Sequence, residues 1–211
     1  MKIAKTSSEI LQCKYLIADV YHRNYKIYFS NDIFDLNAKI EPYPHQFVMG
    51  MIGKELVACT GLYTGQTYVE KYGAVTEEDI QAKIKEAGMT ERYGKARKRE
   101  LTKFVVKEGW NQKGIGKFLW SAAHSRDFIN IGTNDENTIL LCCANQYIYK
   151  HFYESVGIKT RFLKEFPFYR VHEFYRSPEN PMDSRLILPE IDIPEKAYNM
   201  ELPGEYEIGK D

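Results

Sequence analysis

The feature that most constrains the fold is an alternation of strand and helix patterns between residues 99 and 157. Leu101–Val106 (LTKFVV) is rich in β-forming residues, Gly114–Phe128 places apolar residues on one helical face, and Thr138–Ala144 (TILLCCA) is a continuous apolar run. Tyr147–Ser155 reads as a second helix, which Gly157 ends. Two strands joined through a helix in this way lie parallel in a sheet, with a right-handed crossover and both faces buried.

The rest of the chain favours antiparallel strands and covering helices. Glu9–Tyr28 has helical periodicity, and the apolar runs HQFVMGMI and ELVACTGLYTG flank a Gly53–Lys54 turn, which predicts a hairpin. A short helix follows Thr76, which stands at capping-box spacing from Asp79. The runs KTRFLKEF and FYRVHEFY are expected to be two closing strands. The polar stretch 66–99 is either a substrate-binding lid or a mere connection.

Length and charge predict one α/β domain with an acidic extension. We expect the domain over residues 1–177 and a proline-rich tail over residues 178–211 that wraps the surface or is partly disordered. Of the 29 acidic and 29 basic residues, nine acidic and three basic lie in this tail, so the domain carries about +6. An excess this small argues against a nucleic-acid-binding protein and suits an anionic small ligand. With no membrane span and no secretory pattern visible, we expect the protein in the cytoplasm.

The sequence does not predict a metal site. The four cysteines, Cys13, Cys59, Cys142 and Cys143, form no CxxC pair, and the five histidines stand singly. We therefore expect reduced thiols, with Cys142 and Cys143 in the core. A nucleophile elbow of the serine hydrolase kind is also missing from the sequence.

A glycine-containing loop connects the first strand of the alternation to its helix. Its residues are Asn111, Gln112, Lys113, Gly114, Ile115 and Gly116, followed by Lys117. Two glycines let the backbone approach a ligand, and the unpaired amides of a helix start favour a phosphate. Taken alone, the loop fits an ordinary glycine turn better than a phosphate site, because it is neither a P-loop nor a dinucleotide fingerprint.

Two segments together resemble the GNAT superfamily of acyl-CoA-dependent N-acyltransferases. NQKGIG resembles the family's pyrophosphate loop [QR]xxGx[GA], and FYESVGI resembles its fYeklGF helix, in the right order and with the strand TILLCCAN between them. The first loop position, usually Gln or Arg, is Asn111 here. The resemblance covers about residues 99–171. It implies a mixed, mostly antiparallel sheet flanked by helices, whose two parallel central strands splay to admit coenzyme A.

The resemblance also implies a reaction, in which an amine attacks the thioester of acetyl-CoA or another acyl-CoA without a metal. The loop residues 111–117 then hold the pyrophosphate. Tyr153 matches the phenol near the thioester sulfur and is expected to be the general acid, the alternative being a packing aromatic. The backbone of Phe104, Val105 and Val106 matches the strand that pairs with the pantetheine arm, and Asn145, at the end of the next strand, is also assigned to the cofactor.

Glu100 is the expected general base, because carboxylates at the start of this strand serve as base or water-orienting group in several members of the family. The alternative is an ion pair of Glu100 with Arg97, Lys98 or Arg99. The basic run Lys95–Arg99 either steers the phosphates of coenzyme A or is a solvated segment.

Three functions follow from these resemblances. The first is an N-acetyltransferase that acts on a small-molecule primary amine. The string ELTKFVV also resembles E-x-[ST]-[RK]-F-x-V of autoinducer synthases and N-acyl amino acid synthases, which transfer longer acyl groups, often from acyl carrier protein; Lys103 then replaces the usual arginine. The second function is therefore a long-chain N-acyl amino acid or acyl-homoserine lactone synthase. The third is a non-catalytic acyl-CoA-binding module, an option that Asn111 in the loop keeps open.

Overall fold

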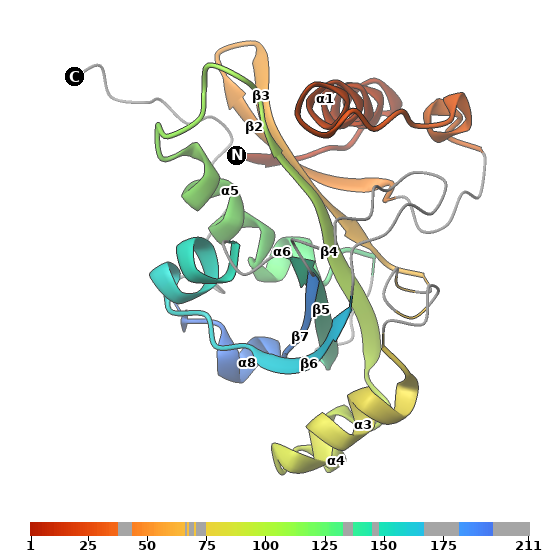
Figure 1. The fold of residues 1–211 in the computed structure, drawn as a ribbon, viewed down its shortest axis with the longest axis vertical. Coiled ribbons are helices and arrows are strands. Elements are labelled where there is room, and N and C mark those ends of the chain that lie inside the picture. The colour runs from red at the N-terminus through yellow and green to blue at the C-terminus, as the bar shows by residue number, and fades with distance from the viewer. Residues whose placement is uncertain are drawn as a thin grey trace.

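The computed structural model describes residues 1–37, 44–65, 67, 70, 75–132, 137–144, 148–166 and 182–195. Its centre is a seven-stranded sheet in the order β1-β2-β3-β4-β5-β7-β6 (Figure 1). Neighbouring strands are antiparallel except β4 and β5, which run parallel. The mixed, mostly antiparallel sheet predicted from the sequence is therefore confirmed. Among the described helices, none is long and apolar enough to cross a bilayer.

Strands, helices and short turns alternate along the described chain. The strands are β1 (Lys2–Ile3), β2 (Gln46–Ile52), β3 (Glu55–Tyr63), β4 (Arg97–Val106), β5 (Thr138–Ala144), β6 (Arg161–Phe166) and β7 (Met182–Ile187). The α-helices are α1 (Ser7–Tyr25), α3 (Glu77–Glu86), α4 (Thr90–Tyr93), α5 (Ile115–Ala123), α6 (Arg126–Ile129) and α8 (Pro189–Asp192). The shorter turns are the 3-10 turn η1 (Asn31–Phe34), the π-helical turn η2 (Tyr149–Tyr153) and the 3-10 turn η3 (Glu154–Val156).

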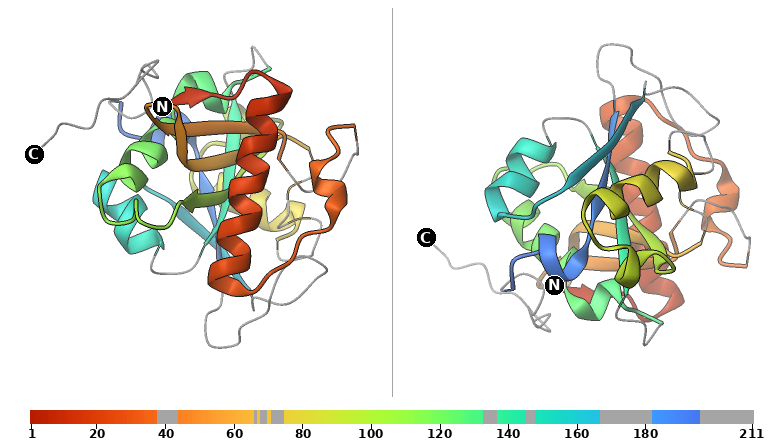
Figure 2. Two further views of the ribbon diagram at one scale, coloured as in Figure 1. Left: turned by 90° about the horizontal axis from the view of Figure 1, so that it is seen from above. Right: turned by 90° about the horizontal axis from the view of Figure 1, so that it is seen from below.

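Helices cover both faces of the sheet. On one face, α1 lies across β2, β3 and β4, and α3 and α4 pack further along, against β5 and β7 (Figures 1 and 2). On the other face lie α5, α6 and η2. Ile139 and Leu141 of β5 point to the α3 side, whereas Leu140 and Cys142 point to the α5 side. Burial of both faces explains why this strand is apolar throughout.

Two of the predicted helices begin at capping boxes. Thr6 accepts a hydrogen bond from the Glu9 amide at 3.2 Å, and the Glu9 carboxylate accepts one from the Thr6 amide at 3.0 Å, so α1 begins slightly earlier than the predicted Glu9. Thr76 and Asp79 form the predicted box at the start of α3, with bonds of 3.2 and 2.9 Å. Local side-chain chemistry therefore sets these two helix starts.

Two predicted helices differ in the structure. The helix expected over 114–128 is interrupted between α5 and α6, where Ser125 Oγ donates to the Ala122 carbonyl at 2.7 Å and His124 Nδ1 bonds to the Trp120 carbonyl at 2.7 Å. These side chains compete with the helical backbone ladder. The second predicted helix, 147–155, is described from residue 148 and contains the π-helical turn η2 before Gly157 ends it at φ 76°.

The prediction of a surface tail from residue 178 is wrong for residues 182–195. Strand β7 lies inside the sheet, paired with β5 on one side and β6 on the other. Leu186, Ile187 and Leu188 are completely buried. The charged residues of this segment suggested an exposed tail. In the structure Asp183 and Asp192 form ion pairs with Arg185 and Arg161, which allows the segment to be buried. The strand predicted at FYRVHEFY lies outside the described residues.

Candidate functional site

The parallel strands β4 and β5 separate halfway along β4. They are paired only as far as Leu101 and Cys142, whereas β4 continues to Val106 beside β3 alone. The register between β3 and β4 shifts just past that point, where Lys103 has a φ of 56°. This β-bulge bends the strand away from β5. The splayed pair of central strands expected from the sequence is therefore present.

Beyond the point of separation, no strand of the described residues lies beside one edge of β4. The Lys107 amide donates to the Val57 carbonyl of β3 at 2.7 Å, so by strand alternation the backbone of Val105 faces β3 too. Phe104 and Val106 then turn their backbone groups toward the gap. Of the three residues predicted to pair with a pantetheine arm, two face the gap, and Val105 does not.

The predicted glycine loop joins the end of β4 to α5. Gly114 has a φ of 80°, with open space where a side chain would be, and provides no side-chain cap for α5. Asn111, Gln112 and Lys113 are exposed, as is Lys117 in the first turn of the helix. Ile115 is buried and can offer a ligand only its backbone amide. Uncapped amides, a positive helix end and two exposed lysines make this segment suited to a phosphate.

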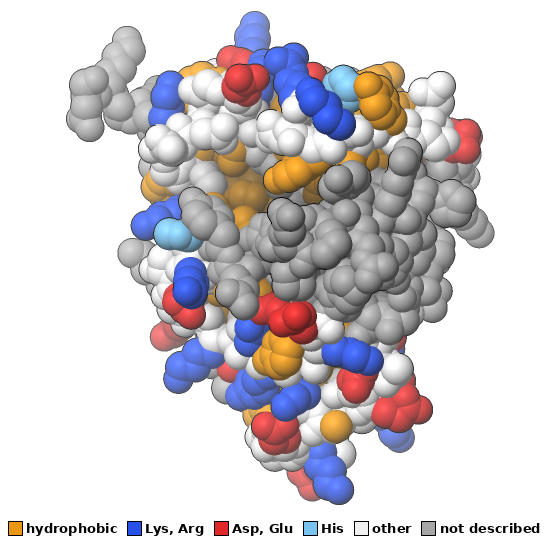
Figure 3. Space-filling view, in the orientation of Figure 1, with side chains coloured by type: hydrophobic (Ala, Val, Ile, Leu, Met, Phe, Trp, Pro, Cys, Tyr) orange, Lys and Arg blue, Asp and Glu red, His pale blue; other side chains and the backbone are white. Residues whose placement is uncertain are grey.

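Gly116 serves a different purpose from Gly114. A Cβ at this position would lie 3.0 Å from the ring of Phe152 on η2, so the glycine permits close approach of α5 and η2. Phe104, Trp120 and Phe152 pack together at this contact, with centroid distances of 4.9, 5.3 and 5.5 Å. We call these three residues the aromatic cluster. In the space-filling view, a hollow floored by hydrophobic side chains opens beside α5 and β4 (Figure 3).

Tyr153, the predicted general acid, lies beneath this cluster. The π-helical turn η2 places its ring 4.6 Å from Trp120, edge to face, and its side chain is 1% exposed. The hydroxyl has no hydrogen-bond partner among the residues that the structure describes. Burial, together with the neighbouring Cys142 thiol, raises the pKa of Tyr153 well above its usual value. The phenol therefore keeps its proton at neutral pH, as a general acid must.

Glu100, the predicted base, is on the opposite face of the sheet. It is 2% exposed and lies opposite Leu141, one position before the last pair of β4 and β5. Burial raises the pKa of Cys143 most, and the negative charge of Glu100 raises it further. Lys98 pairs with Glu70 and Glu77 rather than with this carboxylate. Tyr153 and Glu100 therefore flank the point of strand separation from the two faces.

Lys103, which the sequence marked only through the ELTKFVV string, lies on the Glu100 face. Its ammonium is 5.7 Å from the ring centre of Tyr21 and 5.5 Å from that of Phe29. The side chain is 3% exposed, and its charge lowers the pKa of Cys143 while Glu100 raises it. Two aromatic faces thus hold a buried cation close to the candidate base.

Sequence reasoning missed one further residue at this site, His124. The imidazole is fully buried, and burial lowers its pKa to about 4. Because a carbonyl can only accept, the contact with the Trp120 carbonyl assigns the proton to Nδ1. Nε2 then carries a lone pair and has no partner in the described part of the chain, and the His124 ring centre lies 5.6 Å from that of Tyr153. A single histidine among apolar residues in the sequence does not indicate that the side chain lies beside Tyr153.

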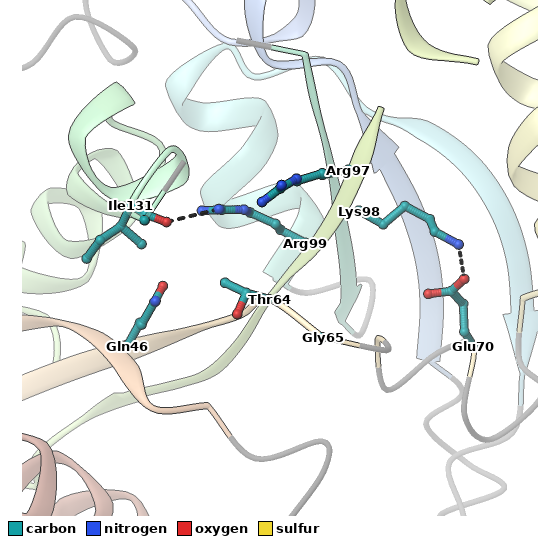
Figure 4. Close-up of a pocket in the computed structure, with 9 residues that line it drawn as sticks. Gln46, Thr64, Gly65, Glu70, Arg97, Lys98, Arg99 and Ile131 are labelled. Atoms are coloured by element: carbon teal, nitrogen blue, oxygen red, sulfur yellow. Dashed lines mark hydrogen bonds and ion pairs between the residues drawn. The ribbon is translucent and has the colours of Figure 1, made fainter. Parts of the chain in front are cut away.

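The basic run Lys95–Arg99 lies at the other end of β4 from the glycine loop. A cavity of about 520 Å³ is lined there by Arg97, Lys98 and Arg99 together with Gln46 and Thr64 (Figure 4). The run ends at Arg99, the third residue of β4, so the last seven residues of the strand, roughly 23 Å, separate it from the loop. Its side chains are therefore too far away to contact phosphates bound at α5. The alternative, a solvated segment, fits exposed Arg97 but not Arg99. The guanidinium of Arg99 is buried and donates to the Ile129 and Ile131 carbonyls.

The remaining predictions concern thiols, metals and Asn145. The four cysteines are free thiols; Cys13, Cys59 and Cys142 are buried, and Cys143 is intermediate. The described residues contain no group of three potential metal ligands. Asn145, assigned to the cofactor from the sequence, lies outside the described residues.

No protein-family model and no curated protein sequence matches the chain. Solved structures do match. FeeM, an N-acyl amino acid synthase from uncultured soil microbes, is 8% identical with a TM-score of 0.54, and the match covers 90% of each chain. The AHL synthase LasI is 13% identical with a TM-score of 0.56, covering 100% of this chain and 97% of that one. A chimera of spermidine N-acetyltransferase SpeG from Vibrio cholerae and hSSAT is 13% identical with a TM-score of 0.52, covering 90% and 95%. At these identities the likeness concerns architecture, and the chain has the fold of the GNAT acyltransferases that its sequence motifs resemble.

Proposed function

We propose that the protein is an N-acyltransferase that moves an acyl group from a coenzyme A thioester to a small-molecule primary amine. The observation that carries the proposal is the arrangement along the gap between β4 and β5. Tyr153 and Glu100 flank the point where the strands separate, and the free edge of β4 leads from there toward the loop and the uncapped start of α5. A thioester that enters along the free edge of β4 has its phosphates at α5 and its reacting carbon between Tyr153 and Glu100.

The proposed roles follow from the needs of the reaction. The amine nitrogen forms a bond to the thioester carbon as the carbon–sulfur bond breaks, and the backbone amides at the free edge of β4 stabilise the oxyanion. Glu100, or a water that it orients, takes the proton that the amine loses. Tyr153 gives its proton to the departing thiolate. The two protein groups exchange protons with solvent before the next cycle.

An acetyl donor is our first choice for the acyl group. The close packing of the aromatic cluster near the entrance to the gap favours a short acyl chain. The fold similarity to a spermidine N-acetyltransferase chimera supports this choice.

A long-chain N-acyl amino acid or acyl-homoserine lactone synthase is the second candidate. It is favoured by the ELTKFVV string. Its Glu100 and Lys103 lie on one face, with Lys103 beside Tyr21 and Phe29, an arrangement suited to an acceptor that carries a carboxylate or carbonyl. The fold similarity to FeeM and LasI supports the same candidate. In this case acyl carrier protein is a further possible donor.

Thermal unfolding of the purified chain with coenzyme A, acetyl-CoA and myristoyl-CoA tests the proposal and separates its two forms. A ligand at 100 times its dissociation constant adds about 2.7 kcal/mol to the free energy of unfolding. Stabilisation by the short donors supports the acetyltransferase, and stabilisation by myristoyl-CoA alone supports the long-chain enzyme. If none of the three stabilises the chain, its acyl donor is not a thioester of coenzyme A.

Turnover then separates an enzyme from a binding module. With a donor that binds, thiol release is followed in the presence of a panel of amines and amino acids. Replacement of Glu100 by Gln should lower kcat at least tenfold while the donor still raises the melting temperature, because the carboxylate is not part of the phosphate-binding loop. If no amine in the panel releases thiol from a donor that binds, a non-catalytic acyl-CoA-binding module becomes the better description.

A further inference from the structure

The cavity of about 520 Å³ at the start of β4, here called the β4 cavity, lies at the opposite end of this strand from the glycine loop (Figure 4). The pairing of β3 with β4 ends at Tyr63 and Glu100. The first three residues of β4 therefore have β5 on one side and no strand of the described residues on the other. Neither Tyr153, Glu100 nor any residue of the glycine loop lines this space.

Three basic side chains and one acidic side chain are among the described residues that line the β4 cavity. The acid, Glu70, forms an ion pair with Lys98, which also pairs with Glu77 outside the cavity. Figure 4 shows Lys98 directed toward Glu70 and away from the two arginines. The excess positive charge of this lining therefore comes from Arg97 and Arg99.

The two arginines project from the same face of β4, because residues two apart on a strand point the same way. Their guanidinium groups lie side by side (Figure 4). Arg99 is buried and held in place by the carbonyls of Ile129 and Ile131. Arg97 is exposed, and its side chain forms no hydrogen bond or ion pair within the part of the chain that the structure describes. Two like charges at close range repel each other, and an anion bound beside them offsets that repulsion.

The β4 cavity is accessible and large enough for a small organic molecule. Three of its lining residues, Thr64, Gly65 and Gly132, are exposed, so the cavity opens to solvent. Its volume lies within the range of roughly 300–1,000 Å³ that is usual for ligand cavities, and exceeds what a bare phosphate ion fills. Gln46 and Thr64 supply uncharged hydrogen-bonding groups on the side opposite the arginines (Figure 4).

These features select the class of ligand. A monoanion neutralises one guanidinium charge, whereas a phosphate monoester concentrates nearly two negative charges in one compact group at neutral pH. Guanidinium groups also match the oxygens of phosphate in geometry. We propose that the β4 cavity is a binding site for a small phosphate monoester, separate from the acyl-transfer site. The inference goes beyond the proposed function, and its test needs no acyl donor.

The binding test uses the full chain without any thioester. Ribose 5-phosphate and glycerol 3-phosphate are titrated by calorimetry beside four comparison compounds: ribose, glycerol, inorganic phosphate and succinate. At least one ester should bind about tenfold more tightly than every comparison compound, because only the esters combine a compact dianion with an organic part that fills the cavity. The proposal is overturned if neither ester binds, or if any comparison compound binds as tightly as the better ester.

Variants at Arg97 place the ester in the β4 cavity. Arg97→Gln should raise the dissociation constant about tenfold or more, and Arg97→Lys should also raise it, because an ammonium lacks the planar fork. Both variants should keep the parental melting temperature, since the side chain is exposed. Lys95→Gln is the matched control. It removes the same charge two residues earlier, from an exposed side chain that does not line the cavity, and should leave the affinity unchanged.

The glycine loop is the other place suited to a phosphate, so Lys113→Gln is measured as well. This variant should leave the affinity for the ester unchanged, because the last seven residues of β4 separate the cavity from the loop. If Lys113→Gln weakens binding and Arg97→Gln does not, the ester binds at the loop and the proposal is wrong. Equal losses in Arg97→Gln and Lys95→Gln would indicate general charge attraction and would overturn the proposal too.

Discussion

Buried polar atoms without a partner gather around Tyr153. Besides its own hydroxyl, Trp120 Nε1 and His124 Nε2 lack partners among the described residues, and the three rings are in contact. The fold leaves such groups unsatisfied in a packed interior only at a cost. Their position beside the gap between β4 and β5 is the main residue-scale reason to place chemistry there.

Removal of the Tyr153 hydroxyl should affect turnover and not stability. Tyr153→Phe breaks no hydrogen bond in the described structure, so its melting temperature should equal or exceed that of the parent. If Tyr153 is the general acid, kcat should fall by about 10²–10⁴-fold with the affinity for the donor retained. Tyr93→Phe, at another fully buried tyrosine packed beside α3, is the control for turnover. A Tyr153→Phe variant with parental kcat would leave Tyr153 as a packing residue.

His124 makes stability depend on pH. The unfolded chain takes up a proton near pH 6.5, whereas burial keeps the folded imidazole neutral down to about pH 4. Protonation therefore favours unfolding, and the free energy of unfolding should fall as the pH falls from 6.5 to 4, by at most roughly 1.4 kcal/mol per pH unit from this group. Urea unfolding across that window should show a smaller dependence of the free energy of unfolding on pH for His124→Asn than for the parent. Equal slopes for His124→Asn and the parent would contradict the assignment.

At the scale of elements, the aromatic cluster should respond to the donor. The rings of Phe104 and Phe152 lie over Gly116 where α5 meets η2, next to the path proposed for the pantetheine arm. Trp120 contacts both rings, so its fluorescence should change when an acyl-CoA binds. In a Trp110→Phe background, Trp120 is the only tryptophan, and the titration reports on it alone. A donor that stabilises the chain without altering this signal would bind elsewhere.

Local chemistry explains which elements could be predicted from the sequence. The capping box at Thr76, the hairpin at Gly53 and the apolar run of β5 each depend on neighbouring residues, and each is present in the structure. Two features were not predicted. The break after α5 arises because the side chains of His124 and Ser125 form hydrogen bonds with backbone carbonyls one turn earlier. The π-helical turn η2 departs from the 3.6-residue period on which helix prediction depends.

The site could be predicted in part for the same reason. The glycine loop and Tyr153 belong to contiguous motifs, so the sequence alone brought them forward. Glu100 and Tyr153 lie on opposite faces at the point where the strands separate. This placement depends on the order of the strands and on the bulge at Lys103. Neither the order nor the bulge has a local signal.

At the scale of the whole molecule, β7 joins the two parts of the sheet. It lies between β5 and β6, so β6 is attached to the rest of the sheet through β7 alone in the order observed. The segment that looked like an acidic tail therefore completes the face on which η2 and Tyr153 rest.

Deletion of residues 178–211 should consequently prevent folding. It removes Leu186, Ile187 and Leu188, all fully buried, and about 2 kcal/mol for each amounts to roughly 6 kcal/mol, comparable with the entire stability of many domains. A chain that ends at Glu195 retains every strand of the described sheet and is the matched control. Circular dichroism during heating should show a cooperative transition for the control and none for the shorter chain. If the chain that ends at residue 177 unfolds cooperatively near the parental temperature, β7 is dispensable and the pairing of β5 with β7 is not what stabilises this side of the sheet.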